Sequence, residues 1–134
     1  MTDEYRFLRY DVSGGIASIE LDRPPVNAIH EAMTDEYFDA LARADQDDAV
    51  KVLILSGRGK GLSAGADLRY LEAFGTQEMA TFLEKFYVQQ VERVRGLTKP
   101  IIASVHGFAR EGACTMAFTC DMVVASNDAS FGYP

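Results

Sequence analysis

Three segments contain the residue types from which a binding site could be built: residues 23–29, 57–67 and 99–121. Each lies just after a predicted strand, which is where α/β folds gather their ligand-binding groups. In the third segment, Gly112 is expected to open a helix. The free N–H groups and the positive dipole end of a helix start suit a developing negative charge. The chemistry indicated is therefore the stabilisation of a small anion by main-chain amides.

The elements that must position these segments alternate between strand and helix. Apolar spacing predicts strands at residues 5–12, 16–22, 51–56, 101–105 and 122–125, a helix at residues 30–45, and a longer helix from Thr76 to Lys99. A short helix is expected after the motif HGFAREGAC. Buried strands that follow helices favour an α/β fold with right-handed crossovers.

Several turns and caps are also predicted. Gly14 and Gly15 are expected to form a hairpin turn, and Thr76 is expected to cap the longer helix. Asp67 and Asp121 are candidates for helix or turn caps. The apolar side of the longer helix is predicted to consist of Met79, Phe82, Leu83, Phe86, Val91 and Val94.

Composition and charge exclude several classes of protein. The chain has 134 residues, of which 48% are hydrophobic and 25% are charged, as is ordinary for one globular domain. Its net charge of -7 would repel a nucleic acid, and its apolar runs are too short to span a membrane. Because the N-terminus lacks the pattern of a signal peptide, a cytoplasmic protein is expected.

The cysteines and histidines indicate neither a metal site nor a disulfide. Cys114 and Cys120 lie in an apolar stretch without a CxxC or Cys/His companion, so buried reduced thiols are expected. His30 and His106 are isolated from each other, and no metal-ligand spacing links them. No metal ion is therefore predicted.

The three segments together resemble a known family. RPPVNAI, GRGKGLSAGADL and KPIIASVHGFAREGACTMAFTCDMVVASNDASFGYP are similar, in order and separation, to signature segments of the enoyl-CoA hydratase/isomerase (crotonase) family. The resemblance runs from about Ile16 to the last residue. It implies a spiral of ββα units that binds an acyl-CoA and normally forms a homotrimer or a dimer of trimers. Because no terminal helix closes the chain, residues 1–134 are interpreted as the N-terminal core of a crotonase-like domain, C-terminally truncated, without its C-terminal helical part.

The resemblance also implies which residues bind the substrate, a coenzyme A thioester, with no separate cofactor. By motif position, the N–H groups of Ala66 and Gly112 form an oxyanion hole around the thioester carbonyl. Coenzyme A is expected at backbone groups near Ala64, Ala66, Asp67 and Leu68, with the 23–29 loop near the nucleotide end. The positive charge that a diphosphate requires would come from Arg23, Arg58, Lys60 and Arg69.

The acid and base positions depart from the family pattern. Hydratases of the family use two glutamates, and here Thr115 occupies the first position while the second would follow Pro134. Isomerisation of a double bond therefore fits better than hydration, and a non-catalytic acyl-CoA-binding subunit or degenerate paralogue is the alternative. Thr115 could orient a water, or its hydroxyl could be satisfied within its own helix. Glu111 could act as a base, but a surface pair with Arg110 is the preferred interpretation.

A serine hydrolase is a further alternative. Gly61, Ser63 and Gly65 match the G-x-S-x-G pattern of a nucleophile elbow, with His106 downstream. Several loop residues separate Ser63 from the preceding strand, however, and an elbow requires a direct strand-to-helix turn. The glycines of the 57–61 segment match neither a dinucleotide fingerprint nor a phosphate-binding loop, so nicotinamide and ATP are not predicted.

Overall fold

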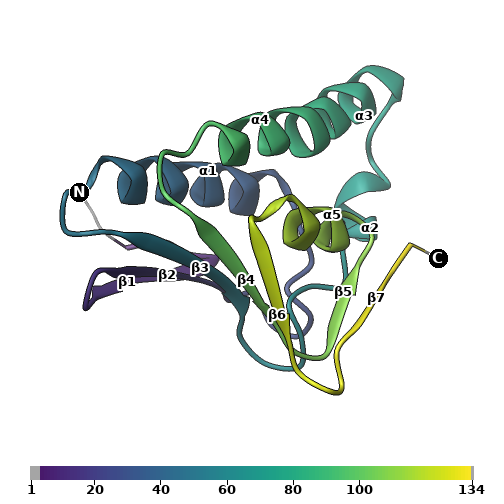
Figure 1. Ribbon diagram of the computed structural model, residues 1–134. Coiled ribbons are helices and arrows are strands. Elements are labelled where there is room, and N and C mark those ends of the chain that lie inside the picture. The colour runs from purple at the N-terminus through teal and green to yellow at the C-terminus, as the bar shows by residue number, and fades with distance from the viewer. Residues whose placement is uncertain (1–3, 134) are drawn as a thin grey trace.

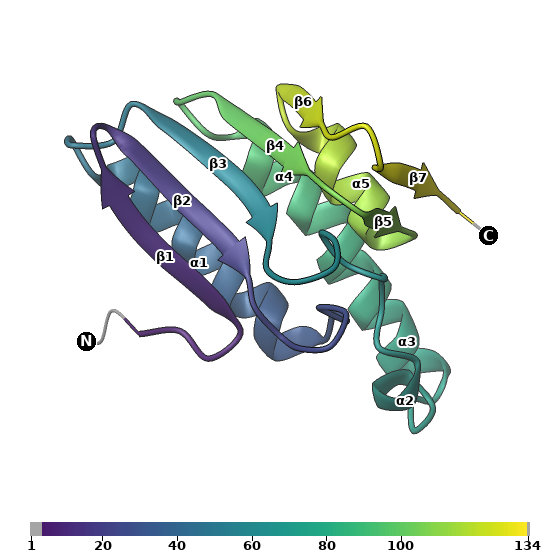
Figure 2. The same cartoon turned by 90° about the horizontal axis from the view of Figure 1, so that it is seen from below.

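The computed structural model describes residues 4–133 as a sheet with helices on one side, shown in two views in Figures 1 and 2. The sheet has the order β1-β2-β3-β4-β6. Its strands are β1 (Leu8–Ser13), β2 (Ile16–Leu21), β3 (Val52–Gly57), β4 (Ile101–Val105) and β6 (Met122–Ala125). β1 and β2 are antiparallel, and every later pair is parallel. The mixed α/β class predicted from the sequence is confirmed.

The first two strands form the expected hairpin. Gly14 and Gly15 have φ values of 59° and 82°, which the turn requires and which glycine adopts without steric cost. The alternation along β2 buries Ala17, Ile19 and Leu21 completely. This face packs against α1 (Glu31–Gln46), whose buried residues include Met33, Tyr37, Leu41 and Ala44 at the predicted helical spacing.

The second long helix is not a continuous α-helix. It consists of α3 (Thr76–Leu83), a π-helical segment η1 (Glu84–Gln89) and α4 (Gln90–Arg95). Its N-cap is Gly75 rather than Thr76, and the Gly75 N–H donates to the Glu78 carboxylate at 3.2 Å. A π-turn holds more residues than an α-turn, so side chains spaced by four stay on one face.

The buried face of this helix corrects the prediction. Phe82, Phe86, Gln90 and Val94 are buried, whereas Leu83 is 43% exposed. Gln90 is fully buried, and its amide atoms have no hydrogen-bond partner within residues 4–133. Because the π-turn alters the register, apolar spacing placed Leu83 on the wrong face.

Two short elements near the loops were not predicted. A second small sheet pairs β5 (Phe108–Arg110) with β7 (Ser130–Gly132), and α2 (Leu68–Leu71) is a single turn. α5 (Gly112–Thr119) and β6 follow as expected, but β6 is exposed along its whole length. Both cysteines are free and buried. No helix within residues 4–133 is long and apolar enough to cross a membrane.

Candidate active site

The structure brings the loops of the three predicted segments side by side, beyond the ends of β2, β3 and β4 (Figure 2). Single β-bridges join Ile29 to Ala66 and Ser63 to Ala109. The Ile29 N–H donates to the Gly65 carbonyl at 2.8 Å, and the Arg110 N–H donates to the Ser63 carbonyl at 3.1 Å. Residues 57–67 are therefore held between the other two segments by main-chain hydrogen bonds.

Asn27 fastens the first loop to the second. Its side chain is 2% exposed, and its amide nitrogen donates to the carbonyls of Arg58 and Leu62, each at 3.0 Å. Its amide oxygen accepts from the Arg23 N–H at 2.7 Å. This role of Asn27 was not predicted from the sequence. An asparagine after two prolines is a turn signal, and Asn27 has a φ of 54°, but its partners lie on another loop.

Ser63 belongs to the same network, and its burial excludes the serine-hydrolase alternative. Its hydroxyl is fully buried, donates to the Asn27 carbonyl at 2.7 Å and accepts from the Gly65 N–H at 3.0 Å. His106 bonds instead to the Gly59 carbonyl at 2.6 Å. A serine in this position holds the loop and cannot reach a substrate.

Gly65 brings the second loop into contact with the start of α5. It has a φ of 101°, and a Cβ placed there would lie 2.9 Å from the Glu111 Cβ and 3.0 Å from the Arg110 carbonyl oxygen. Only glycine allows this approach. Consequently Ala66 follows directly after the point where the two loops touch, and Gly112 follows directly after Glu111.

The N–H groups of Ala66 and Gly112 are not used by the fold. Gly112 is the first residue of α5, as predicted, so its N–H has no intrahelical acceptor. Within residues 4–133, neither the Ala66 N–H nor the Gly112 N–H donates to a main-chain or side-chain oxygen. Two free donors thus flank one contact between loops, which is the composition of a main-chain anion site.

Gly112 is packed under an aromatic ring. A Cβ at this position would lie 2.4 Å from the Phe86 Cε2, and Phe86 is buried on the π-helical segment. The ring therefore fixes how close α5 lies to η1. π-turns recur at functional sites, and here the π-turn supplies the residue against which the helix start is set.

The Thr115 hydroxyl is not satisfied within its own helix, which was one of the two predicted alternatives. Its hydroxyl forms a hydrogen bond with the Tyr133 hydroxyl rather than within its own helix. Thr119 makes the intrahelical bond instead, donating to the Thr115 carbonyl at 2.7 Å. The position of the first family glutamate thus holds a neutral hydroxyl engaged by a tyrosine. The second glutamate position follows Pro134, which lies outside the described residues.

The preferred interpretation of Glu111 is also wrong. Within residues 4–133 no ion pair joins Glu111 to Arg110. The Arg110 guanidinium lies instead beside Gly132 of β7. Glu111 is exposed, and it adopts φ 52° and ψ -124°, a conformation that favours glycine.

The positively charged residues expected to bind coenzyme A differ in the hydrogen bonds and ion pairs that they already make within the protein. Arg23 donates to the Asp67 carboxylate and to the Ala28 carbonyl, each at 2.8 Å. Arg58 lies 3.7 Å from the Glu20 carboxylate. Lys60 and Arg69 are exposed and form no ion pair within the described part of the chain. Among these cations, Lys60 and Arg69 are therefore the most available to an anionic ligand.

The backbone expected to contact coenzyme A is partly engaged. The Ala64 N–H donates to the Val26 carbonyl at 3.0 Å, and the Asp67 N–H donates to the Ile29 carbonyl at 2.8 Å. Leu68 presents a side chain that is 75% exposed. Of the N–H groups at residues 64, 66 and 67, only that of Ala66 has no acceptor within residues 4–133.

Asp67 is the N-cap of α2, as one interpretation expected. Its carboxylate accepts from the N–H groups of Arg69 and Tyr70, at 3.1 and 3.3 Å. The Arg23 guanidinium lowers the pKa of this carboxyl, and the two backbone bonds lower it further, against an opposing contribution from burial. Asp121 does not act as the expected helix or turn cap, because its carboxylate accepts from the N–H of Ile101, the first residue of β4, at 2.8 Å.

Replacing Asp67 by asparagine should alter the response of stability to acid. Because the folded-state pKa lies below the ordinary value of 3.8, the stabilisation is complete above that pH and is lost as the pH falls through the folded-state pKa. We expect Asp67→Asn to lower the free energy of unfolding by about 1 kcal/mol at neutral pH and to make no difference in acid. Denaturant unfolding at both pH values measures this, with Asp48→Asn on an exposed turn as the control. A deficit that persists in acid would contradict the electrostatic explanation.

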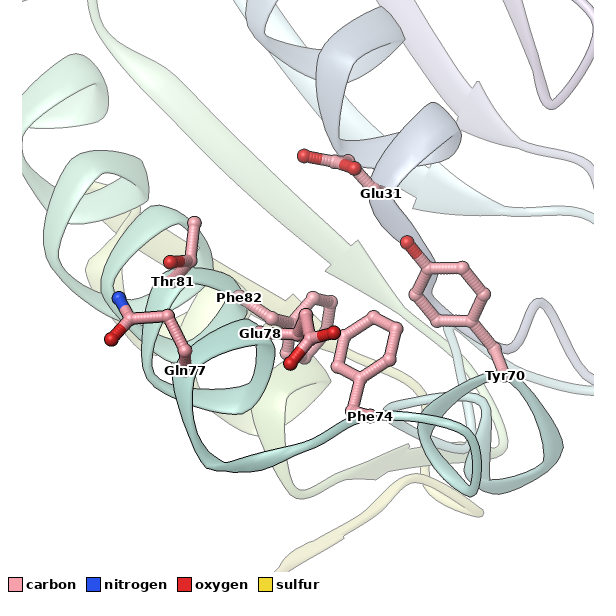
Figure 3. A pocket seen from close by; sticks show the side chains of 7 residues that line it. All are labelled: Glu31, Tyr70, Phe74, Gln77, Glu78, Thr81 and Phe82. Carbon is pink, nitrogen blue, oxygen red and sulfur yellow. The ribbon is translucent and has the colours of Figure 1, made fainter.

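A pocket of about 300 Å³ lies beside this site but does not contain the free donors. Figure 3 shows its lining, which includes the rings of Tyr70, Phe74 and Phe82, with Glu78 between Phe74 and Phe82 and Glu31 on the same side as Tyr70. Phe82 stacks on Phe86 at a centroid distance of 6.3 Å, which links the pocket to the ring beneath Gly112. Two carboxylates make the pocket unsuitable for a diphosphate. Its apolar lining suits an uncharged group.

The fold and the contact between loops define an α/β protein with two free amides, one on each side of the contact between Gly65 and Glu111. The family model described as enoyl-CoA hydratase/isomerase matches residues 11–134. The chain is 36% identical over 133 residues to a probable enoyl-CoA hydratase of Rhizobium meliloti (strain 1021), covering 97% of this chain and 50% of the relative. It is 32% identical over 129 residues to 1,2-epoxyphenylacetyl-CoA isomerase of Escherichia coli (strain K12), covering 93% of this chain and 49% of the relative.

Solved structures show the same relationship. An enoyl-CoA hydratase/isomerase from Xanthobacter autotrophicus Py2 superimposes with a TM-score of 0.91 at 35% identity, covering 98% of this chain and 50% of that chain. The chain belongs to the enoyl-CoA hydratase/isomerase family and has the crotonase fold. It spans about half the length of the relatives that it matches.

Proposed function

We propose that the protein acts on an acyl-CoA thioester and stabilises its enolate with the N–H groups of Ala66 and Gly112. The observation that carries this proposal is that both amides lack an acceptor within residues 4–133 and flank the contact between Gly65 and Glu111. Family membership supports the substrate class, because the named relatives are hydratases or isomerases of acyl-CoA compounds. Coenzyme A enters as part of the substrate, and no further cofactor is proposed.

Fixed amides favour the enolate over the neutral thioester. Negative charge on the carbonyl oxygen increases as the α-proton leaves, so hydrogen bonds to that oxygen strengthen in the transition state. Each donor is worth about 3 kcal/mol, or roughly a hundredfold in rate. The positive end of α5 adds to this at Gly112. This stabilisation would operate whatever follows the enolate.

Double-bond isomerisation is the reaction that these residues support best. Hydration requires a group that activates water, and Thr115 offers only a hydroxyl already bonded to Tyr133. Isomerisation needs a single group that removes and returns a proton.

Lys60 and Arg69 supply exposed positive charge for the diphosphate of coenzyme A. We further propose a cytoplasmic enzyme that assembles as a homotrimer or a dimer of trimers.

Hydrogen exchange tests the enzymatic proposal. In deuterated water, 3-hexenoyl-CoA should lose its α-proton signal in the NMR spectrum when the protein is added, and 2-hexenoyl-CoA should accumulate. A thioether analogue without the carbonyl oxygen should bind more weakly than the thioester, because both amides would lose their acceptor. Binding of both compounds without exchange would instead identify a non-catalytic acyl-CoA-binding protein.

A further inference from the structure

The start of α5 lacks the family glutamate but carries another carboxylate. Thr115, one turn into the helix, is neutral and is bonded to Tyr133. Glu111 is the residue directly before Gly112 and is the N-cap of α5, although its own side chain makes no capping hydrogen bond. The Glu111 carboxylate therefore belongs to the residue next to one free amide and does not cap the helix.

Glu111 is held in a conformation that is unfavourable for a residue with a side chain. Its φ of 52° and ψ of -124° belong to a region where glycine is the usual residue. Main-chain bonds maintain this conformation: the Glu111 N–H donates to the Gly132 carbonyl at 2.9 Å, and the Glu111 carbonyl accepts from the Cys114 N–H at 2.9 Å. Such residues occur preferentially at sites where side-chain direction matters for function.

The direction of the side chain is set by Gly65. The Glu111 Cβ and Cγ lie 2.9 and 3.2 Å from the point where a Cβ of Gly65 would be. The side chain thus leaves the main chain across Gly65, which immediately precedes Ala66. The Glu111 Cβ and Cγ therefore lie against Gly65, the residue before Ala66, and Glu111 itself directly precedes Gly112.

The carboxylate of Glu111 has no structural partner. It is exposed, and it forms no hydrogen bond or ion pair within residues 4–133. The Tyr87 hydroxyl lies near it. Burial raises the pKa of the Tyr87 hydroxyl, and the nearby Tyr133 and Glu111 raise it further. Tyr87 therefore places an uncharged hydroxyl, and not a cation, near the Glu111 carboxylate.

We propose that Glu111 is the catalytic base of this site. This inference rests on the proposed function. The carboxylate removes a proton from the α-carbon of a 3-enoyl-CoA, and the electron pair of the broken C–H bond is delocalised into a dienolate whose oxygen is held by Ala66 and Gly112. The protonated carboxyl then returns the proton to the γ-carbon. The double bond moves into conjugation with the thioester, and the carboxylate is regenerated without any other reactant.

Glu111→Gln tests the base directly. The amide has the same shape but cannot accept a proton, so we expect exchange and isomerisation of 3-hexenoyl-CoA to fall about a hundredfold or more. The dissociation constant of 3-hexenoyl-CoA should stay within about threefold, because the amides that bind the oxygen are retained. Glu111→Asp should keep part of the activity. Glu92→Gln, on the exposed side of α4, is the matched control and should behave as wild type.

The same measurements separate failure of this inference from failure of the proposed function. If wild type and Glu111→Gln exchange the α-proton at similar rates, Glu111 is not the base, while the enolate-stabilising function stands. If wild type binds 3-hexenoyl-CoA but never exchanges it, the proposed enzyme activity and the role of Glu111 are both refuted. A loss of binding in Glu111→Gln equal to its loss of rate would assign Glu111 to substrate binding and overturn its role as a base.

Discussion

Replacing Gly112 by alanine is expected to lower the rate of α-proton exchange about a hundredfold. The added methyl group would lie 2.4 Å from the Phe86 ring, so α5 must move or the ring must turn. Because Phe86 is buried, either movement disturbs the packing around it and costs stability. A movement of α5 also displaces the Gly112 N–H from its position beside residues 57–67. The exchange rate of 3-hexenoyl-CoA and the thermal midpoint of unfolding measure the two consequences.

A second variant distinguishes steric displacement from general damage. Phe86→Leu removes the atoms that the new methyl group would meet, so Gly112→Ala combined with Phe86→Leu should recover part of the activity lost in Gly112→Ala. The two substitutions are in contact and are expected to be non-additive. Gly75→Ala is the control, because a Cβ there meets only the flexible carboxylate of Glu78. Strictly additive losses of activity would refute the proposed steric clash between the Phe86 ring and the methyl group added at Gly112.

The regular elements near the site were predictable because their patterns are local. Alternation in β2 placed Ala17, Ile19 and Leu21 on the buried face, and helical spacing identified α1 to within a residue at each end. Gly112 was expected to open a helix, and α5 begins there. Each of these features follows from side chains within a few positions of one another.

The features that were missed depend on contacts across the chain. A π-turn leaves no period of its own in the apolar pattern, so the burial of Gln90 and the exposure of Leu83 could not be predicted. β5 and β7 have three residues each, and they form a sheet only because distant segments meet.

The backbone conformation of Glu111 could not be predicted from the sequence for a related reason. Positive φ is usually indicated by glycine, asparagine or aspartate, and a glutamate gives no such signal. The preferred pairing with Arg110 rested on adjacency in sequence. In the folded chain, however, the Arg110 side chain lies beside Gly132 of β7, and the missing side chain of Gly65 leaves space for that of Glu111. The two adjacent side chains thus lie against different parts of the chain, that of Arg110 against β7 and that of Glu111 against residues 57–67.

Asn27→Asp should be the most destabilising conservative substitution in the loops. The change replaces the amide NH₂ with an oxygen that faces the carbonyls of Arg58 and Leu62, which lie 3.0 Å from the present nitrogen. Two hydrogen bonds are lost, and a buried carboxylate is set against two acceptors. We expect the free energy of unfolding to fall by about 4 kcal/mol at neutral pH, since each unsatisfied buried group costs roughly 1–3 kcal/mol.

The physical cause of that loss can be tested with acid. A buried aspartate surrounded by acceptors has a raised pKa, and its protonated form can donate one hydrogen bond, so the deficit relative to wild type should shrink as the pH is lowered. Asn127→Asp, the same substitution at an exposed position, should change the free energy of unfolding by less than about 0.5 kcal/mol. Denaturant unfolding at neutral and mildly acidic pH provides both comparisons. A deficit that is independent of pH would mean that Asn27 stabilises the loops through its shape and its φ of 54°, and not through the hydrogen bonds that join residues 23–29 to residues 57–62.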